Sequence, residues 1–199
     1  MNPTEYEKNV LITESNNFPV IKERTDDKMI RLLHAGLGLS SELSELADGY
    51  MNEEIDWVNI AEEIGDLTWY CAVATNALEF DAEEIAKHGN AVTISLVRTR
   101  EGLKQVLLTG VYLVGEFNDL LKKSLFYGRE LDLTALQKKL QQLSIVTSNL
   151  ALVSGTTIEE VRQTNINKLK ARYGEKFTEA AALNRDLETE RKVLEEGKS

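Results

Sequence analysis

The sequence has one cysteine, two histidines and two prolines among its 199 residues. One cysteine excludes an internal disulfide framework and a zinc site built from several thiolates, and two histidines leave little for a histidine-rich metal centre. Carboxylates are therefore the only abundant metal ligands in the chain. Both prolines, Pro3 and Pro19, lie near the start, so the rest of the chain contains no residue that must interrupt a helix.

Long apolar runs and a basic excess are also missing. No run approaches the ~18 apolar residues that indicate a membrane-spanning helix, and the acidic start MNPTEYEK is unlike a signal peptide. We therefore expect a cytoplasmic protein with no membrane partner. The 33 acidic and 23 basic residues give a formal charge of -10, which disfavours nucleic acid as a partner because the phosphate backbone would be repelled. A phosphate-bearing ligand should be small or bridged by a metal ion.

Apolar residues recur at steps of three and four, the pattern of helices that each bury one side. Thr25, with Asp26 and Asp27, offers a capping start for the first such helix, and Gly49 with the polar residues 52–54 predicts its end and a short loop. Helices joined by a short loop should lie antiparallel. We predict an all-α fold. The first stripe is Leu32, Gly36, Leu39, Leu43, Leu46 and Tyr50, and the second is Ile60, Ile64, Leu67, Cys71, Ala74 and Leu78.

The pattern of this helical hairpin returns later in the chain. We therefore predict a tandem duplication whose two hairpins form a four-helix core, an internal pseudo-dimer, with additional peripheral helices. The expected parts are an N-terminal arm (1–25), a first repeat with its connecting segment (26–100) and a second repeat (101–199). A shift of 74 residues places Gly36, Glu42 and Glu45 on Gly110, Glu116 and Asp119, and a shift of 76 places Ile60, Ile64 and Leu67 on Leu136, Leu140 and Leu143.

Five acidic residues of the first repeat form two motifs. Glu42 and Glu45 are three residues apart, as are Glu63 and Asp66, so each pair lies on one helix face; Glu62 adjoins the second pair. Carboxylates that converge from two helices repel one another unless a cation neutralises them, and hard oxygen ligands suit Mg²⁺ or Mn²⁺. We therefore predict a divalent-metal site on these five residues. The alternative is that they are the solvated side of an amphipathic helix.

A polar stripe near the end of the second repeat is the candidate phosphate-binding element. Asn165, Lys168 and Arg172 fall at positions i, i+3 and i+7, so an amide, an ammonium and a guanidinium share one face and could contact a polyphosphate. The alternative is an ordinary solvated basic stripe. Trp69 could stack on a nucleobase or pack in the core.

Three motifs in combination resemble those of the MazG-like nucleotide pyrophosphohydrolases of the all-α NTP pyrophosphatase superfamily. The chain is similar to phage-type and bacterial members over most of its length after residue 28. The motifs are Glu42-x-x-Glu45, Glu62-Glu63-x-x-Asp66 and Asn165-x-x-Lys168-Leu169-x-x-Arg172-Tyr173.

This resemblance implies an enzyme that uses Mg²⁺, or Mn²⁺, to hydrolyse the α–β bond of nucleoside triphosphates, giving a monophosphate and pyrophosphate. A carboxylate that the metal does not fully engage could accept the proton of the attacking water. We expect it to be Glu45 or Glu63, and the sequence does not separate the two. The implied substrate-binding residues are Asn165, Lys168, Arg172, Trp69 and Lys122. The identity of the base and sugar stays open.

The second repeat departs from the family pattern, because the segment matching Glu62–Asp66 reads Lys-Lys-Leu-Gln-Gln at 138–142. In the first repeat, Gly89 and Val92 stand at the positions that match Asn165 and Lys168. We therefore expect one composite site, with the metal bound by the first repeat and the phosphates largely by the second. Further pairing with a second copy stays open. Two alternative functions also stay open: a nucleotide-binding regulatory protein with weak turnover, and a structural helical interaction module.

Overall fold

The computed structural model describes residues 1–87, 97–174 and 176–196, and within these residues every regular element is a helix. The predicted all-α fold is therefore confirmed. The helices are α1 (Pro3–Thr13), α2 (Phe18–Glu23), α3 (Asp27–Met51), α4 (Trp57–Ala77), α5 (Ala82–Ala86), α6 (Arg100–Tyr127), α7 (Leu133–Val153), α8 (Ile158–Tyr173), α9 (Glu179–Leu183) and α10 (Leu187–Glu196).

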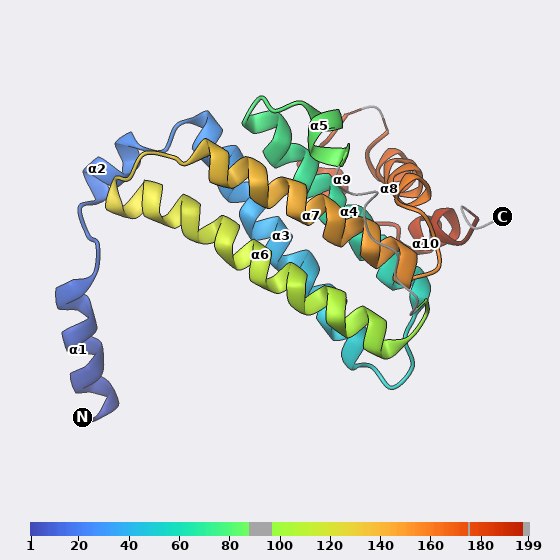
Figure 1. Cartoon of the computed structure of the whole chain (residues 1–199), viewed down its shortest axis with the longest axis horizontal. Coiled ribbons are helices and arrows are strands. Elements are labelled where there is room, and N and C mark those ends of the chain that lie inside the picture. Colours follow the sequence, from blue (N-terminus) through green and yellow to red (C-terminus); the bar gives the residue numbers. More distant parts are fainter. Residues whose placement is uncertain (88–96, 175, 197–199) are drawn as a thin grey trace.

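The four longest helices form one bundle. α3 packs against α4 and α6, and α7 packs against α4 and α6, so the helices surround a shared core (Figure 1). The loops within the two hairpins are short, 52–56 between α3 and α4 and 128–132 between α6 and α7. Leu39, Ile64, Phe117 and Leu140, one from each helix, are fully buried in this core.

Polar caps fix where the helices begin. Asp26, one of the three residues that the sequence offers as a cap, accepts a hydrogen bond of 2.7 Å from the amide of Met29 at the start of α3. Asp56 does the same for α4, accepting from the amide of Val58 at 2.9 Å. At α8, Thr157 and Glu160 form a reciprocal capping box. Each cap satisfies amide groups that the first helical turn leaves unpaired.

Two glycines that are one predicted repeat apart allow the hairpins to pack closely. A Cβ added at Gly36 in α3 would overlap Oδ1 of Asn118 in α6, and one added at Gly110 in α6 would lie 3.0 Å from Leu43 in α3. The shift of 74 residues maps Ser44 onto Asn118, whereas Gly110 meets Leu43. The duplication and the pseudo-dimer therefore stay predictions.

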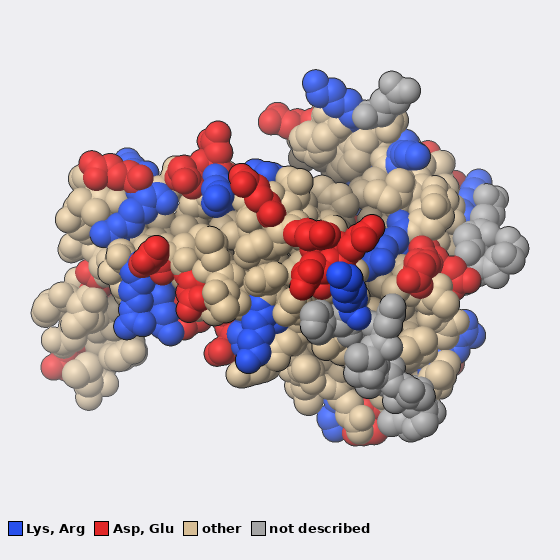
Figure 2. Space-filling view, turned by 45° about the horizontal axis from the view of Figure 1, so that its top comes forward, with Lys and Arg blue, Asp and Glu red and all other residues tan. Residues whose placement is uncertain are grey.

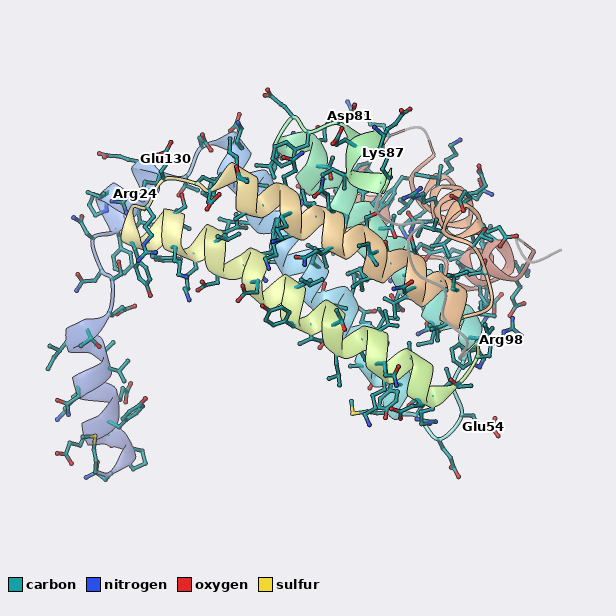
Figure 3. The ribbon with its side chains drawn as sticks, viewed as in Figure 1. Arg24, Glu54, Asp81, Lys87, Arg98 and Glu130 are labelled. Carbon is teal, nitrogen blue, oxygen red and sulfur yellow. The ribbon has the colours of Figure 1, made fainter. Side chains whose placement is uncertain are left out.

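The remaining helices lie around the bundle. α1 has no buried residue and projects away from the other helices (Figure 1). Arg24 donates to the carbonyl of Leu125 at 3.0 Å, and at the opposite end of the bundle Arg98 donates to the carbonyl of Ser154 at 3.2 Å (Figure 3). α8 packs on α4 and α7, and α10 packs on α8 and α4. The C-terminal helices therefore cover one side of α4, the helix that carries the second acidic motif.

Charges of both signs lie on the surface. On the face in Figure 2, Lys and Arg side chains lie among Asp and Glu side chains. None of the described helices is both long enough and apolar enough to cross a membrane.

Candidate functional site

Three carboxylates converge between α3 and α4. Glu42 and Glu45 lie one turn apart on α3, Glu63 lies on α4, and one oxygen of each side chain is within 4.8 Å of the others. Glu42 and Glu63 are buried, whereas Glu45 is exposed, so the cluster is open to solvent on one side. Three side chains arranged in this way could hold a metal ion, and carboxylate oxygens are the ligands that hard divalent cations prefer. We call these three residues the carboxylate cluster.

Burial and mutual repulsion raise the pKa values of the two buried members of this cluster, Glu42 and Glu63. Burial, followed by the charge of Glu45 and the other nearby carboxylates, raises the pKa of Glu63 to about 8. Burial, with the charges of Asp66 and Glu45, raises the pKa of Glu42 to about 7. A divalent cation would favour the charged forms, so its binding should release protons from this site.

Glu62 and Asp66, the other two predicted metal ligands, bind Lys168 of α8. The ammonium nitrogen lies 2.5 Å from Oδ2 of Asp66 and 3.1 Å from Oε1 of Glu62, and the lysine is fully buried. Asn165 donates to Oδ1 of Asp66 at 2.6 Å. Both oxygens of Asp66 are thus engaged by α8. The structure places Glu62 and Asp66 beside the carboxylate cluster, in contact with the late polar stripe.

Gly65 allows α8 to lie this close to α4. A Cβ added at Gly65 would lie 2.9 Å from Cβ of Asn165 and 3.0 Å from its Nδ2. A larger residue would therefore separate the two helices. This close approach unites the second acidic motif with the polar stripe, as the expected composite site requires. Gly89 and Val92, the matching positions of the first repeat, lie outside the described residues.

A cleft of about 480 Å³ opens beside the carboxylate cluster. Its lining includes all five predicted acidic ligands, two arginines and several aromatic rings. Trp69 lines the cleft with 36% of its surface exposed, so it is not a core residue. Its ring packs edge-on against Tyr70, with centroids 5.0 Å apart, and against His34 at 6.1 Å. The cleft therefore combines acidic, basic and aromatic surfaces.

The predicted polar stripe is divided between two environments. Asn165 and Lys168 are buried against α4 and do not line the cleft, whereas Arg172 does. Asn165 and Lys168 therefore meet the carboxylates of α4 instead of solvent, and Arg172 pairs with Glu190 of α10. Lys122 is exposed on α6, lies outside the cleft lining and pairs with Asp119 at 2.5 Å.

Sequence reasoning missed the contribution of the C-terminal segment. Glu190 in α10 is only 3% exposed and accepts hydrogen bonds from Arg172, at 2.8 and 2.5 Å, and from Arg185, at 2.7 Å. Burial alone would raise the pKa of Glu190, but the bonds from the two arginines lower it to about 2. An available signal was its spacing from Leu187 and Leu194, which places an acid on the apolar stripe of a helix.

In the second hairpin, lysines pair with Glu116 and Asp119, the two acids that match Glu42 and Glu45. Lys139 lies 3.7 Å from Glu116, and Lys122 and Lys123 both pair with Asp119. Among the described residues, Glu116 and Asp119 do not belong to a group of three or more metal-ligating side chains. The group of acids that could hold a metal lies in the first hairpin, and the metal itself stays a prediction.

Comparisons of the chain with models of protein families, with curated proteins and with solved structures find no match. A functional assignment therefore depends on the geometry of the carboxylate cluster and the cleft, together with the sequence motifs.

Proposed function

We propose that the protein is a Mg²⁺-dependent nucleoside triphosphate pyrophosphohydrolase that produces a nucleoside monophosphate and pyrophosphate. The observation that carries this proposal is the carboxylate cluster, whose oxygens lie within 4.8 Å of one another in a cleft that also presents Arg172 and Arg185. Carboxylates and guanidinium groups together suit a ligand bound through both a metal ion and direct ion pairs, as a metal–triphosphate is. Mn²⁺ is the alternative ion.

Glu42, Glu45 and Glu63 would hold the metal ion. When bound, the ion would offset the negative charge of the phosphates and lower the pKa of a coordinated water. Whichever of Glu45 and Glu63 is not fully engaged by the ion would accept the proton of the water that attacks the α-phosphorus, while the bond to the bridging oxygen breaks and pyrophosphate leaves. Glu45 is the solvent-exposed candidate and Glu63 the buried one.

The cations and aromatic rings around the cluster would bind the rest of the substrate. Arg172 lines the cleft and would contact the phosphates directly. Lys168 would not contact the phosphates; its buried ammonium group would instead fix the carboxylates of Glu62 and Asp66 beside the cleft. Trp69 offers a ring in the cleft on which a nucleobase could stack.

A nucleotide-binding regulatory protein with weak turnover is the second candidate. It is favoured by the engagement of Asp66, whose two oxygens are occupied by Lys168 and Asn165. In this arrangement the cluster has three carboxylates, fewer than the five acidic ligands that the motifs predict.

A substrate panel separates these functions. The protein should be incubated with ribo- and deoxynucleoside triphosphates and Mg²⁺, with release of monophosphate and pyrophosphate followed directly. The proposal predicts both products in equal amounts and none without the metal. Thermal stabilisation by Mg²⁺ and nucleotide without products would support the regulatory protein. If Mg²⁺ and nucleotide neither stabilise the protein nor give products, the structural helical interaction module is the function that stays in agreement with the data.

A further inference from the structure

The segment after α9 contributes a second cation to the cleft. Arg185 lines the cleft, and its side chain is 41% exposed. Its Nη2 donates to Glu190 at 2.7 Å and lies 3.8 Å from a carboxylate oxygen of Glu62. Arg185 therefore lies between the C-terminal helix and the acidic side of the cleft, where it is accessible to a ligand.

Glu190 holds Arg185 and Arg172 on one carboxylate. Arg172 donates to Oε1 from Nε and to Oε2 from Nη2, and Arg185 donates to Oε2 from Nε and Nη2. We call these three residues the arginine–glutamate unit. Two positive charges and one negative charge leave the unit with a net charge of +1. It is thus a positively charged surface beside the carboxylate cluster, ordered by a buried anion.

The neighbouring Lys168 does not provide such a surface. It is fully buried, and both Glu62 and Asp66 bind its ammonium group. A phosphate could reach it only if these ion pairs opened. Among the described residues that line the cleft, the permanently charged cations are Arg172 and Arg185.

We infer that Arg185 is a phosphate-binding residue of the cleft and that Glu190 is the residue that positions it together with Arg172. The ligand is the pair of phosphates at the end of a nucleoside triphosphate, the part that leaves as pyrophosphate. The planar guanidinium group suits this ligand because it can donate two parallel hydrogen bonds to phosphate oxygens. The inference rests on the proposed function and extends it to the C-terminal segment.

Inorganic tripolyphosphate with Mg²⁺ is the probe, titrated calorimetrically into the full-length protein. Removing a charge-assisted hydrogen bond should weaken binding about tenfold or more, so we expect this loss for Arg185→Ala. Lys192→Ala is the matched control, because it removes a positive charge from an exposed position in the same segment and should leave the affinity within about twofold. Equal affinities for the two variants and the wild type would overturn the inference, as would a wild type that does not bind tripolyphosphate.

Glu190→Gln tests positioning. If Glu190 merely competed with the phosphates, removing its negative charge would tighten tripolyphosphate binding. A positioning role predicts weaker binding and a higher KM for the nucleotide, with a smaller change in kcat, because the two guanidinium groups would then repel each other and separate. Tighter binding would overturn this part of the inference. Arg185→Lys keeps the positive charge but removes the planar guanidinium group. If the planar group matters, this variant should bind tripolyphosphate more tightly than Arg185→Ala but less tightly than the wild type. The measurement also tests the phosphate site if Glu190→Gln fails to fold.

The same measurements separate this inference from the proposed function. Arg185-dependent binding of tripolyphosphate without hydrolysis of any nucleotide would contradict the enzyme and support the phosphate site. Hydrolysis that is unaffected by Arg185→Ala in KM and kcat would support the enzyme and contradict the phosphate site.

Discussion

The ammonium nitrogen of Lys168 lies 2.5 Å from Oδ2 of Asp66, in a position where the lysine has no exposed surface. This contact joins residues 102 positions apart in the chain and connects α8 to the side of α4 that carries the second acidic motif. A buried ammonium group is tolerated only when its charge is compensated. The pair therefore fixes the position of Asp66 next to the carboxylate cluster.

Replacing Lys168 should destabilise the protein strongly. Lys168→Met leaves Glu62 and Asp66 without their partner, and breaking a buried ion pair in this way costs about 3–5 kcal/mol of unfolding free energy. Lys170→Met is the control, because Lys170 is exposed on the same helix. Urea denaturation of both variants measures the difference. Equal stabilities would show that the ion pair does not hold α8 on α4.

Gly65 should tolerate no side chain. Gly65→Ala would place a Cβ 2.9 Å from that of Asn165, and such overpacking costs about 1–3 kcal/mol. At Gly115 in α6, an added Cβ would meet no atom within 4 Å, so Gly115→Ala should stabilise the protein by about 0.5–1 kcal/mol through helix propensity. Thermal denaturation of the two variants should show a lower melting temperature for Gly65→Ala and a higher one for Gly115→Ala. A Gly65→Ala variant more stable than the wild type would contradict the close packing of α4 and α8.

The metal-free protein should lose stability as the pH rises above 5. In the folded state the pKa of Glu63 is raised from 4.5 to about 8 and that of Glu42 from 4.5 to about 7. Between these values the folded state binds more protons than the unfolded state, so the free energy of unfolding falls with pH. The stabilisation that these two protonated carboxyl groups provide is complete below pH 4.5. It is lost as the pH rises through their pKa values in the folded protein, about 7 and about 8.

Chemical denaturation in the presence of a chelator, at pH 5, 6, 7 and 8, measures this dependence. Glu63→Gln should flatten it, since glutamine does not titrate. A stability that is constant or increases over this range would show that Glu63 and Glu42 titrate normally in the folded protein.

The helices and the location of the carboxylate cluster follow from local patterns in the sequence. Asp26 marks the start of α3 because a cap acts within one helical turn. Spacing places Glu42 and Glu45 on one face, and the short loop 52–56 returns α4 alongside α3 so that Glu63 meets them. Each step depends on residues that are close in the chain.

The partners of the polar residues could not be predicted in the same way. Periodicity places Asn165, Lys168 and Arg172 on one face of α8 but does not say which surface that face meets. The burial of Lys168 depends on how α8 crosses α4 at Gly65, a contact between residues far apart in the chain. Glu190 was missed although its spacing placed it on an apolar stripe, because its contact with Arg172 depends on the packing of α10 on α8.

Magnesium binding by two matched variants tests the central claim most directly. Calorimetric titration of Mg²⁺ into Glu63→Gln and Glu116→Gln compares the cluster on α3 and α4 with the lysine-paired acid of the second hairpin. The account predicts that Glu63→Gln abolishes binding and nucleotide hydrolysis, while Glu116→Gln changes either by no more than about twofold. Equal losses in both variants, or unchanged binding in Glu63→Gln, would contradict a single metal site in the first hairpin.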